Sequence, residues 1–210
     1  MAASADRLVW IDCEMTGLNP EHDELVEIAV IVTDFELEPL HPGLDLVIKP
    51  SDAAREGMGD FVREMHAASG LLDELDAGLS LEEAQSTVVE YVRGLIPGEQ
   101  RAAIAGNTIG TDRVFISRFL PELDALLHYR SVDVSSIKEL ARRWFPRAYF
   151  NAPSKNGGHR ALADIQESIR ELAYYRKAVF RDEPGLTSAE LGELSATFGA
   201  AAVAEPPAQV

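Results

Sequence analysis

The fold of this chain is decided by the stretch LVWIDCE at residues 8–14. Residues 8–13 are apolar apart from Asp12, and such a run is typical of a buried strand. Successive side chains of a strand point to opposite faces, so Asp12 and Glu14 project together while Cys13 turns to the other, packed face. The stretch therefore predicts a core strand that carries two carboxylates side by side at its end.

The two carboxylates of this strand repel each other. At a separation of about 4 Å and an effective dielectric constant of about 20, the repulsion is about 4 kcal/mol. A divalent cation would remove that cost, and carboxylate oxygens are hard ligands that suit Mg²⁺ or Mn²⁺. An isolated Asp-x-Glu pair, however, more often marks a strand end that opens into solvent, with both acids hydrated.

Further strands are expected on both sides of this one in the sheet. Two β-rich runs follow at residues 26–33 and 44–48, with turn residues between them, and such short links favour an antiparallel meander. Later, strand-like residues 102–105 and 130–134 alternate with helical patterns, which indicates parallel pairing. The chain is therefore expected to be an α/β protein with a mixed five-stranded sheet flanked by helices.

Helical spacing of apolar residues predicts the helices that flank this sheet. A Ser-x-x-Glu capping box begins the first, over residues 81–96. Asp112 can cap the next helix, which Pro121 breaks or restarts. The last two are expected over residues 137–144 and 160–179. The predicted order of elements is β-β-β-α-β-α-β-α-α.

The charge of the chain limits what it can bind. Its 210 residues contain 19 Lys and Arg against 35 Asp and Glu, which gives a formal net charge of −16. Phosphate binding depends on Lys and Arg that release counterions, so this acidic protein has no broad footprint for long nucleic acid. A polyanion that it handles must be short or must meet a local basic patch, and residues 130–160 carry such a local excess of Arg and Lys.

Export and membrane insertion are not expected for this chain. Residues 1–7 show no basic segment followed by an apolar run, so they do not resemble a secretory signal. No apolar stretch approaches the length of a membrane span. Cys13 is the single cysteine, so an intrachain disulfide is impossible and an oxidising compartment is not required. We expect a cytoplasmic protein with no membrane partner.

The C-terminal part of the chain has a different composition. From Asp182 onward there is no Lys or Arg, and Ala, Gly and Pro are frequent. We expect one main domain over residues 1–181 and an acidic, partly disordered tail over residues 182–210. Within the tail, residues 187–198 could form a short helix, and residues 200–210 are expected to be disordered.

Two later segments carry acids that could join the first pair. The stretch GNTIGTD at residues 106–112 follows a strand and opens a helix, where ligand sites of α/β sheets often lie. Plain N-capping is the alternative role for Asp112. The stretch HRALAD begins the last long helix with His159 and ends at Asp164. Five residues turn an ideal helix by about 140°, so these two would not share a face and His159 is expected in the loop at the helix entry. Alternatively, Asp164 is an exposed acid on the helix, and His159 is a polar residue at the helix start.

In this order, the acids and the histidine resemble the four-acid-plus-histidine 3′–5′ exonucleases of the ribonuclease H-like fold, and oligoribonucleases more closely still. The matching runs are WIDCEMTGL (10–18), GNTIGTDR (106–113), HYR (128–130), DVS (133–135), KELARRW (138–144) and ELAYYR (171–176). Together these matches are far more specific than any one of them. The resemblance covers about residues 6–181, which implies that the main domain, residues 1–181, is an exonuclease domain.

The resemblance implies a phosphodiester hydrolase that uses two metal ions. The expected ligands of these two divalent cations, Mg²⁺ or Mn²⁺, are Asp12, Glu14, Asp112 and Asp164. His159 is implied as the group that accepts the proton of the attacking water, since histidine exchanges protons near neutral pH.

The resemblance also implies a substrate, namely very short oligoribonucleotides, down to dinucleotides, that are degraded from the 3′ end. Leu18 is implied as a wedge against the bases and Phe61 as a stacking surface, although both could instead be core residues. Phe61 stands where the family often has Trp.

The 5′ phosphate of the substrate is implied to be capped by four side chains, which are His66, Thr108, Arg130 and Ser135. Thr108 stands where the family usually has Ser, and the hydroxyl is kept. Arg130 could instead pair with a helix carboxylate. Tyr129 is implied to come from the other subunit of a homodimer.

Three other functions remain open at this point. The first motif loosely imitates the loop of aspartyl-phosphate phosphatases, in which the first acid is a nucleophile, but Glu14 and the His159 motif argue against that class. A proofreading-type DNA exonuclease of the same fold is a nearer alternative. The third is an acidic interaction module that kept the fold and lost the chemistry, which loss of any one of the five site residues would support; all five are present.

Overall fold

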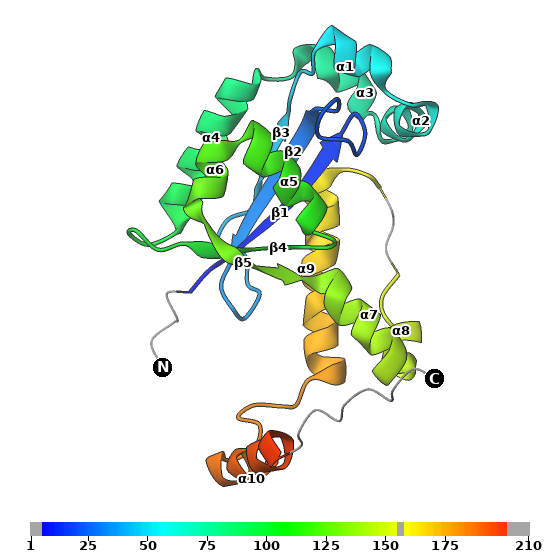
Figure 1. Ribbon diagram of the computed structural model, residues 1–210. Helices are drawn as coiled ribbons and strands as arrows, with labels where there is room; N and C mark the ends of the chain where they lie inside the picture. The colour runs from blue at the N-terminus through cyan, green and yellow to red at the C-terminus, as the bar shows by residue number, and fades with distance from the viewer. Residues whose placement is uncertain (1–5, 155–157, 201–210) are drawn as a thin grey trace, which may run out of the picture.

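A mixed five-stranded sheet forms the centre of the molecule (Figure 1). The computed structural model describes residues 6–154 and 158–200, and its strands lie in the order β3-β2-β1-β4-β5. The strands are β1 (Leu8–Met15), β2 (Leu25–Thr33), β3 (Leu44–Val47), β4 (Ala102–Gly106) and β5 (Leu127–Asp133). β1 and β3 both pair antiparallel with β2, while β4 runs parallel to its neighbours β1 and β5. The predicted meander and the predicted parallel second half are both confirmed.

Helices cover both faces of the sheet and one of its ends (Figure 1). Between β3 and β4 come α1 (Asp52–Gly57), α2 (Asp60–Ser69), α3 (Leu71–Glu74), the 3-10 turn η1 (Leu75–Ala77) and α4 (Leu81–Leu95). The later helices are α5 (Gly110–Phe119), α6 (Pro121–Leu126), α7 (Val134–Trp144), α8 (Pro146–Phe150), α9 (Ala161–Val179) and α10 (Ser188–Ala200). The short helices α1, α2 and α3 lie beyond the end of β1, so they border the point where its two carboxylates emerge.

The alternation of β1 sends its side chains to two separate cores. Ile11 and Cys13 pack with buried side chains of α4, α5 and α6. Trp10 packs with buried side chains of α9 on the opposite face. Burying a large aliphatic or aromatic side chain stabilises the fold by about 1.5–3 kcal/mol, so the register of β1 is strongly fixed. Asp12 and Glu14 continue the series of Trp10 and therefore face α9, as the sequence predicts.

The helices between β3 and α4 are missing from the predicted order of elements. α1, α3 and η1 are too short for a clear apolar period, and α2 begins and ends at glycines within this run of short segments. Ser51 Oγ accepts a hydrogen bond from the Ala54 N–H at 3.2 Å at the start of α1, and Gly70 ends α2 with a φ of 80°. Leu71 anchors the segment in a small core with Met58. Helices of this length depend on such packing, which the sequence pattern alone does not reveal.

Other boundaries shift by a few residues from those expected. β5 begins at Leu127 rather than at residue 130, and α7 begins at Val134 rather than at residue 137. The short helix expected at residues 187–198 is confirmed as α10. Residues 201–210 lie outside the described residues, so the disorder expected there stays a prediction, as does the division of the chain after residue 181. Within residues 6–154 and 158–200, no helix combines the length and the apolar character that a bilayer span requires.

Candidate active site

The acid pair on β1 does not lie at a strand end that opens into solvent, because Glu14 is buried and Asp12 is partly buried. The pKa of Glu14 is raised to about 8, mainly by burial and also by the negative charges of Glu27, Asp164 and Asp112, while Arg160 acts in the opposite direction. Burial also raises the pKa of Asp12 well above its ordinary value, and the largest charge effects come from Asp112, Glu14 and Asp164. The four carboxylates therefore lie close enough to oppose one another's ionisation.

Asp112 does not cap α5, so the alternative role given to it by the sequence is wrong. Ile109 occupies the N-cap position, and Asp112 lies inside the first turn of the helix. Its Oδ1 accepts a hydrogen bond from the backbone N–H of Cys13 at 3.0 Å. This contact ties α5 to β1 at the residue between Asp12 and Glu14. Burial raises the pKa of Asp112 to about 7, although hydrogen bonds from backbone N–H groups lower it.

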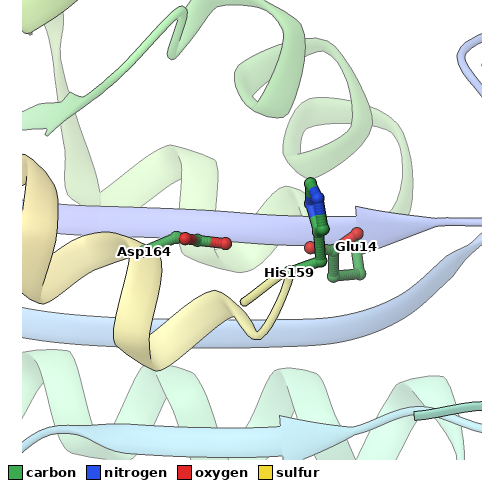
Figure 2. Close-up of side chains that lie close together, drawn as sticks. All are labelled: Glu14, His159 and Asp164. Carbon is green, nitrogen blue, oxygen red and sulfur yellow. The ribbon is translucent and has the colours of Figure 1, made fainter. Parts of the chain in front are cut away.

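His159 and Asp164 reach the acid pair from the beginning of α9. Figure 2 shows the Asp164 carboxylate extending from the helix toward Glu14, with the His159 ring beside them. Ligand atoms of these three side chains all lie within 4.8 Å of one another. His159 precedes the helix, with an unusual positive φ of 48°. The loop position expected for His159 is confirmed, because a helical His159 would have turned away from Asp164.

The five side chains fit a site for hard divalent cations. Their carboxylates are oxygen donors of the kind that Mg²⁺ and Mn²⁺ prefer, and an imidazole nitrogen lies beside them. The raised pKa values of Asp12, Glu14 and Asp112 indicate that negative charge there is poorly compensated by the protein itself. A cation would remove that imbalance. The roles of the five residues nevertheless stay a prediction.

A small polar cluster forms where β4 and β5 end. Thr108 Oγ1 lies 3.1 Å from Ser135 Oγ. Asp133 Oδ1 accepts hydrogen bonds from the backbone N–H groups of both residues, at 3.0 and 2.9 Å. Thr108 has a positive φ of 54°, and Ser135 Oγ also donates to Asn107 Oδ1 at 3.0 Å. Two of the four expected phosphate-binding side chains are thus brought together.

The other two expected phosphate ligands lie elsewhere in this chain. His66 is fully buried, and its Nε2 donates to the carbonyl oxygen of Met15 at 2.9 Å, while its Nδ1 lies 3.9 Å from Glu14 Oε2. Burial lowers the pKa of His66, although its hydrogen bond to the Met15 carbonyl acts in the opposite direction. Arg130 lines a pocket with Arg7 and other residues at the start of the parallel strands. Phosphate binding by His66 and Arg130 stays a prediction.

A bulge in β5 exposes Tyr129 and Arg130. Ala103 pairs with His128 and Ile104 pairs with Ser131, so the two residues between them have no partner in β4. Tyr129 is 74% exposed, and the guanidinium carbon of Arg130 lies 5.5 Å from the centre of its ring. Among residues 6–154 and 158–200, no helix carboxylate forms an ion pair with Arg130. The alternative in which Arg130 pairs with a helix carboxylate is therefore wrong for the described part of the chain.

Leu18 and Phe61 are surface residues. Leu18 follows β1 and is 76% exposed, and Phe61 lies in the first turn of α2 and is 79% exposed. Their alternative role as core residues is therefore wrong. Contact of these two side chains with a substrate stays a prediction.

Sequence reasoning missed Glu27, which lies directly opposite Glu14 on the neighbouring strand β2. Glu27 is 0% exposed and accepts hydrogen bonds from Arg160 Nε at 2.8 Å and from the Ala161 N–H at 2.9 Å. A charged residue inside the apolar run VEIAVIVT was the available signal. Its partner at the start of α9 was not visible from the sequence.

Comparison with known proteins identifies close relatives. The exonuclease family matches residues 9–172. An oligoribonuclease of Leifsonia xyli subsp. xyli is 64% identical over 198 residues, which cover 94% of this chain and 96% of that protein. An oligoribonuclease of Streptomyces griseus is 57% identical over 197 residues, which cover 94% of this chain and 98% of that protein.

Among solved structures, exonuclease I has a similar fold. Exonuclease I of Methylocaldum szegediense aligns with a TM-score of 0.60 at 20% identity, over 83% of this chain and 41% of that one. The zinc-bound complex of E. coli exonuclease I with single-stranded DNA aligns with a TM-score of 0.62 at 15% identity, over 84% and 41%. The chain thus spans about two fifths of those longer proteins and shares their ribonuclease H-like fold, as predicted. On the strength of its family match and its close relatives, the chain belongs to the oligoribonucleases, the 3′–5′ exoribonucleases within the exonuclease family.

Proposed function

We propose that this protein hydrolyses very short oligoribonucleotides, down to dinucleotides, from the 3′ end and releases 5′-mononucleotides. The observation that carries the proposal is the convergence of four carboxylates and one imidazole from β1, α5 and the beginning of α9. The raised pKa of Glu14, about 8, supports the same idea, because a site built for cations has excess negative charge without them.

The proposed ligands of two divalent cations, Mg²⁺ or Mn²⁺, are Asp12, Glu14, Asp112 and Asp164. Bound ions supply charge neutralisation at the phosphodiester and lower the pKa of the attacking water. The hydrogen bond from the Cys13 N–H holds one oxygen of Asp112, which leaves its other oxygen for a ligand. The close spacing of Glu14 and Asp164 favours their sharing one ligand.

His159 is proposed as the general base of the reaction. Its ring lies beside Glu14 and Asp164 and is exposed, so water and substrate can reach it. Proton transfer needs the imidazole within hydrogen-bond reach of the attacking water.

Substrate length is proposed to be limited at the two ends of the site. Leu18 and Phe61 offer exposed apolar surfaces for the bases, and stacking of a base on an aromatic ring is worth about 1–3 kcal/mol. Thr108 and Ser135 present paired hydroxyls that suit a terminal 5′ phosphate. The net charge of −16 supports a short substrate over a long one.

We further propose that the protein acts as a homodimer. The bulge exposes Tyr129 and Arg130, which places their side chains where they can contact a neighbouring subunit. In this arrangement, Tyr129 completes the phosphate end of the partner's site, while Arg130 is proposed to cap the 5′ phosphate in its own chain. We also propose that the enzyme acts in the cytoplasm, where the buried thiol of Cys13 stays reduced. Residues 1–181 are the proposed exonuclease domain.

The proposal is tested by comparing a labelled diribonucleotide with a long single-stranded DNA in the presence of Mg²⁺ or Mn²⁺. We expect rapid release of mononucleotides from the dinucleotide and slow degradation of the DNA. The opposite preference would favour a proofreading-type exonuclease. Trapping a covalent phosphate on Asp12 would favour the phosphatase mechanism. Loss of all hydrolysis with both metals would favour an interaction module.

A further inference from the structure

The residue that follows His159 forms an ion-pair cluster. Arg160 Nε donates to Glu27 Oε1 at 2.8 Å, and its two terminal nitrogens donate to both carboxylate oxygens of Glu74 at 2.8 and 3.2 Å. The guanidinium thus engages two carboxylates from different elements, β2 and α3. Paired contacts of this kind fix both the position and the plane of an arginine.

Glu27 anchors the cluster to the sheet. Its side chain is completely buried, and its second oxygen accepts the N–H of Ala161 at 2.9 Å. Ala161 is the first residue of α9, so Glu27 satisfies one of the N–H groups that a helix start leaves without an internal partner. Glu27 therefore holds the backbone immediately after Arg160 as well as its side chain.

Glu74 closes the cluster from the opposite side. It lies at the end of α3, and its side chain is 47% exposed. The short helices α2 and α3 are contiguous and also carry Phe61. Through Glu74, the segment with the proposed stacking surface is joined to the residue beside His159.

The backbone of His159 explains why such a cluster matters. A φ of 48° lies in the left-handed region, which is uncommon for residues other than Gly even though Asn, Asp and His adopt it more often than most, and such a backbone persists when its surroundings hold it. The residue before it is Gly158, which is exposed. Directly after His159, Arg160 and Ala161 hold the described end of this loop through their contacts with Glu27 and Glu74.

We propose that Glu27 and Glu74 are positioning residues that hold the His159 imidazole in the site by clamping Arg160. This inference deepens the proposed function, because it rests on His159 acting as the general base. The cluster touches none of the reacting atoms itself. Its effect is on the geometry of proton transfer, for which a misplacement of about 1 Å can cost about 100-fold in rate.

Glu74 offers the cleanest test, since a half-exposed ion pair contributes little to stability. We expect Glu74→Ala to lower kcat on a diribonucleotide about 10-fold or more, with KM changed less than about twofold. Glu74→Gln keeps one acceptor for Arg160 and should recover part of the loss. Asp73→Ala is the matched control, because Asp73 is an exposed acid on the same helix. It should leave kcat unchanged, and thermal unfolding should show the same midpoint for all three variants within a few degrees.

A double-mutant cycle with His159→Ala separates positioning from other effects. In single-turnover reactions, Glu74→Ala should slow the wild-type background but cause no further loss once the imidazole is absent. Equal losses in both backgrounds would overturn the proposal, as would a kcat for Glu74→Ala equal to that of Asp73→Ala. Glu27→Gln should likewise lower kcat in the wild-type background and cause no further loss in the His159→Ala background. Near-normal turnover of the His159→Ala single variant would instead refute the general base itself, and with it this inference.

Discussion

Replacing Glu14 by Gln should stabilise the cation-free protein while abolishing its activity. Gln has nearly the same shape as Glu, so the substitution removes the charge and leaves the packing in place. Burial and three neighbouring acids raise the pKa of Glu14 from 4.5 to about 8. A carboxyl group with a raised pKa in the folded state destabilises the fold wherever the unfolded state is ionised.

The expected pH dependence has a definite sign. Below pH 4.5, Glu14 is protonated in both states and costs nothing. Between pH 4.5 and about 8, the unfolded state releases this proton while the folded state retains it, so the free energy of unfolding falls by about 1.4 kcal/mol per pH unit. Above pH 8 the loss is complete. A shift from 4.5 to about 8 is about 3.5 units, or about 5 kcal/mol, and relaxation with water entry reduces it to the order of 2–5 kcal/mol.

The assay is thermal unfolding in a chelator between pH 4.5 and 9. For a chain of this size, about 2–5 kcal/mol corresponds to about 5–15 °C in Tm. Glu14→Gln should match the wild type at pH 4.5 and exceed it by that amount at pH 8.5. Glu90→Gln, which removes an exposed acid of α4, should follow the wild-type curve at every pH.

Addition of Mn²⁺ provides the complementary measurement. A cation that binds the folded state alone raises Tm, and it should do so more for the wild type than for Glu14→Gln, which lacks this proposed ligand. Parallel pH curves for the two proteins in chelator would refute the reasoning, because the acid cluster would then carry no electrostatic cost.

Three other substitutions test the proposed roles. His159→Ala should lower turnover by about 100-fold or more, the range for loss of a general base, while calorimetric titration still detects Mn²⁺ binding; wild-type turnover would remove His159 from catalysis. Phe61→Ala should raise KM for a diribonucleotide by about 10-fold through lost stacking, whereas Phe198→Ala, which removes an exposed aromatic ring of α10, should leave KM unchanged. Arg130→Ala should cost more on a 5′-phosphorylated dinucleotide than on a longer oligomer, and equal losses on both would contradict a role at the 5′ phosphate.

Local rules of strand geometry are sufficient to predict that the two acids of β1 lie side by side. Asp12 and Glu14 share a face because strand side chains alternate, and the packing of Cys13 against the opposite core fixes which face that is. The expected loop position of His159 follows equally directly from the turn angle of an α-helix. Both conclusions need only the nearest few residues of the chain.

Contacts between distant segments account for what the sequence could not show. Asp112 has the sequence context of a helix cap, but its carboxylate accepts the Cys13 N–H, 99 residues earlier in the chain. The bulge at Tyr129 exists only relative to β4, so no local pattern reports it. His66 reaches the Met15 carbonyl from α2, a helix that the apolar periodicity did not reveal.

Glu27 shows how the fold and the site depend on each other. A buried carboxylate directly across from Glu14 adds to the repulsion in the site, since its charge raises the pKa of Glu14. The same carboxylate accepts hydrogen bonds from Arg160 and from the first N–H of α9, and the Arg160 charge lowers the pKa of Glu14. Replacing Glu27 by an apolar residue would relieve part of the repulsion but would release the start of α9. Glu27 therefore adds negative charge beside Glu14 while it fixes the beginning of α9, which is the pattern expected if the placement of His159 sets the rate, as we propose.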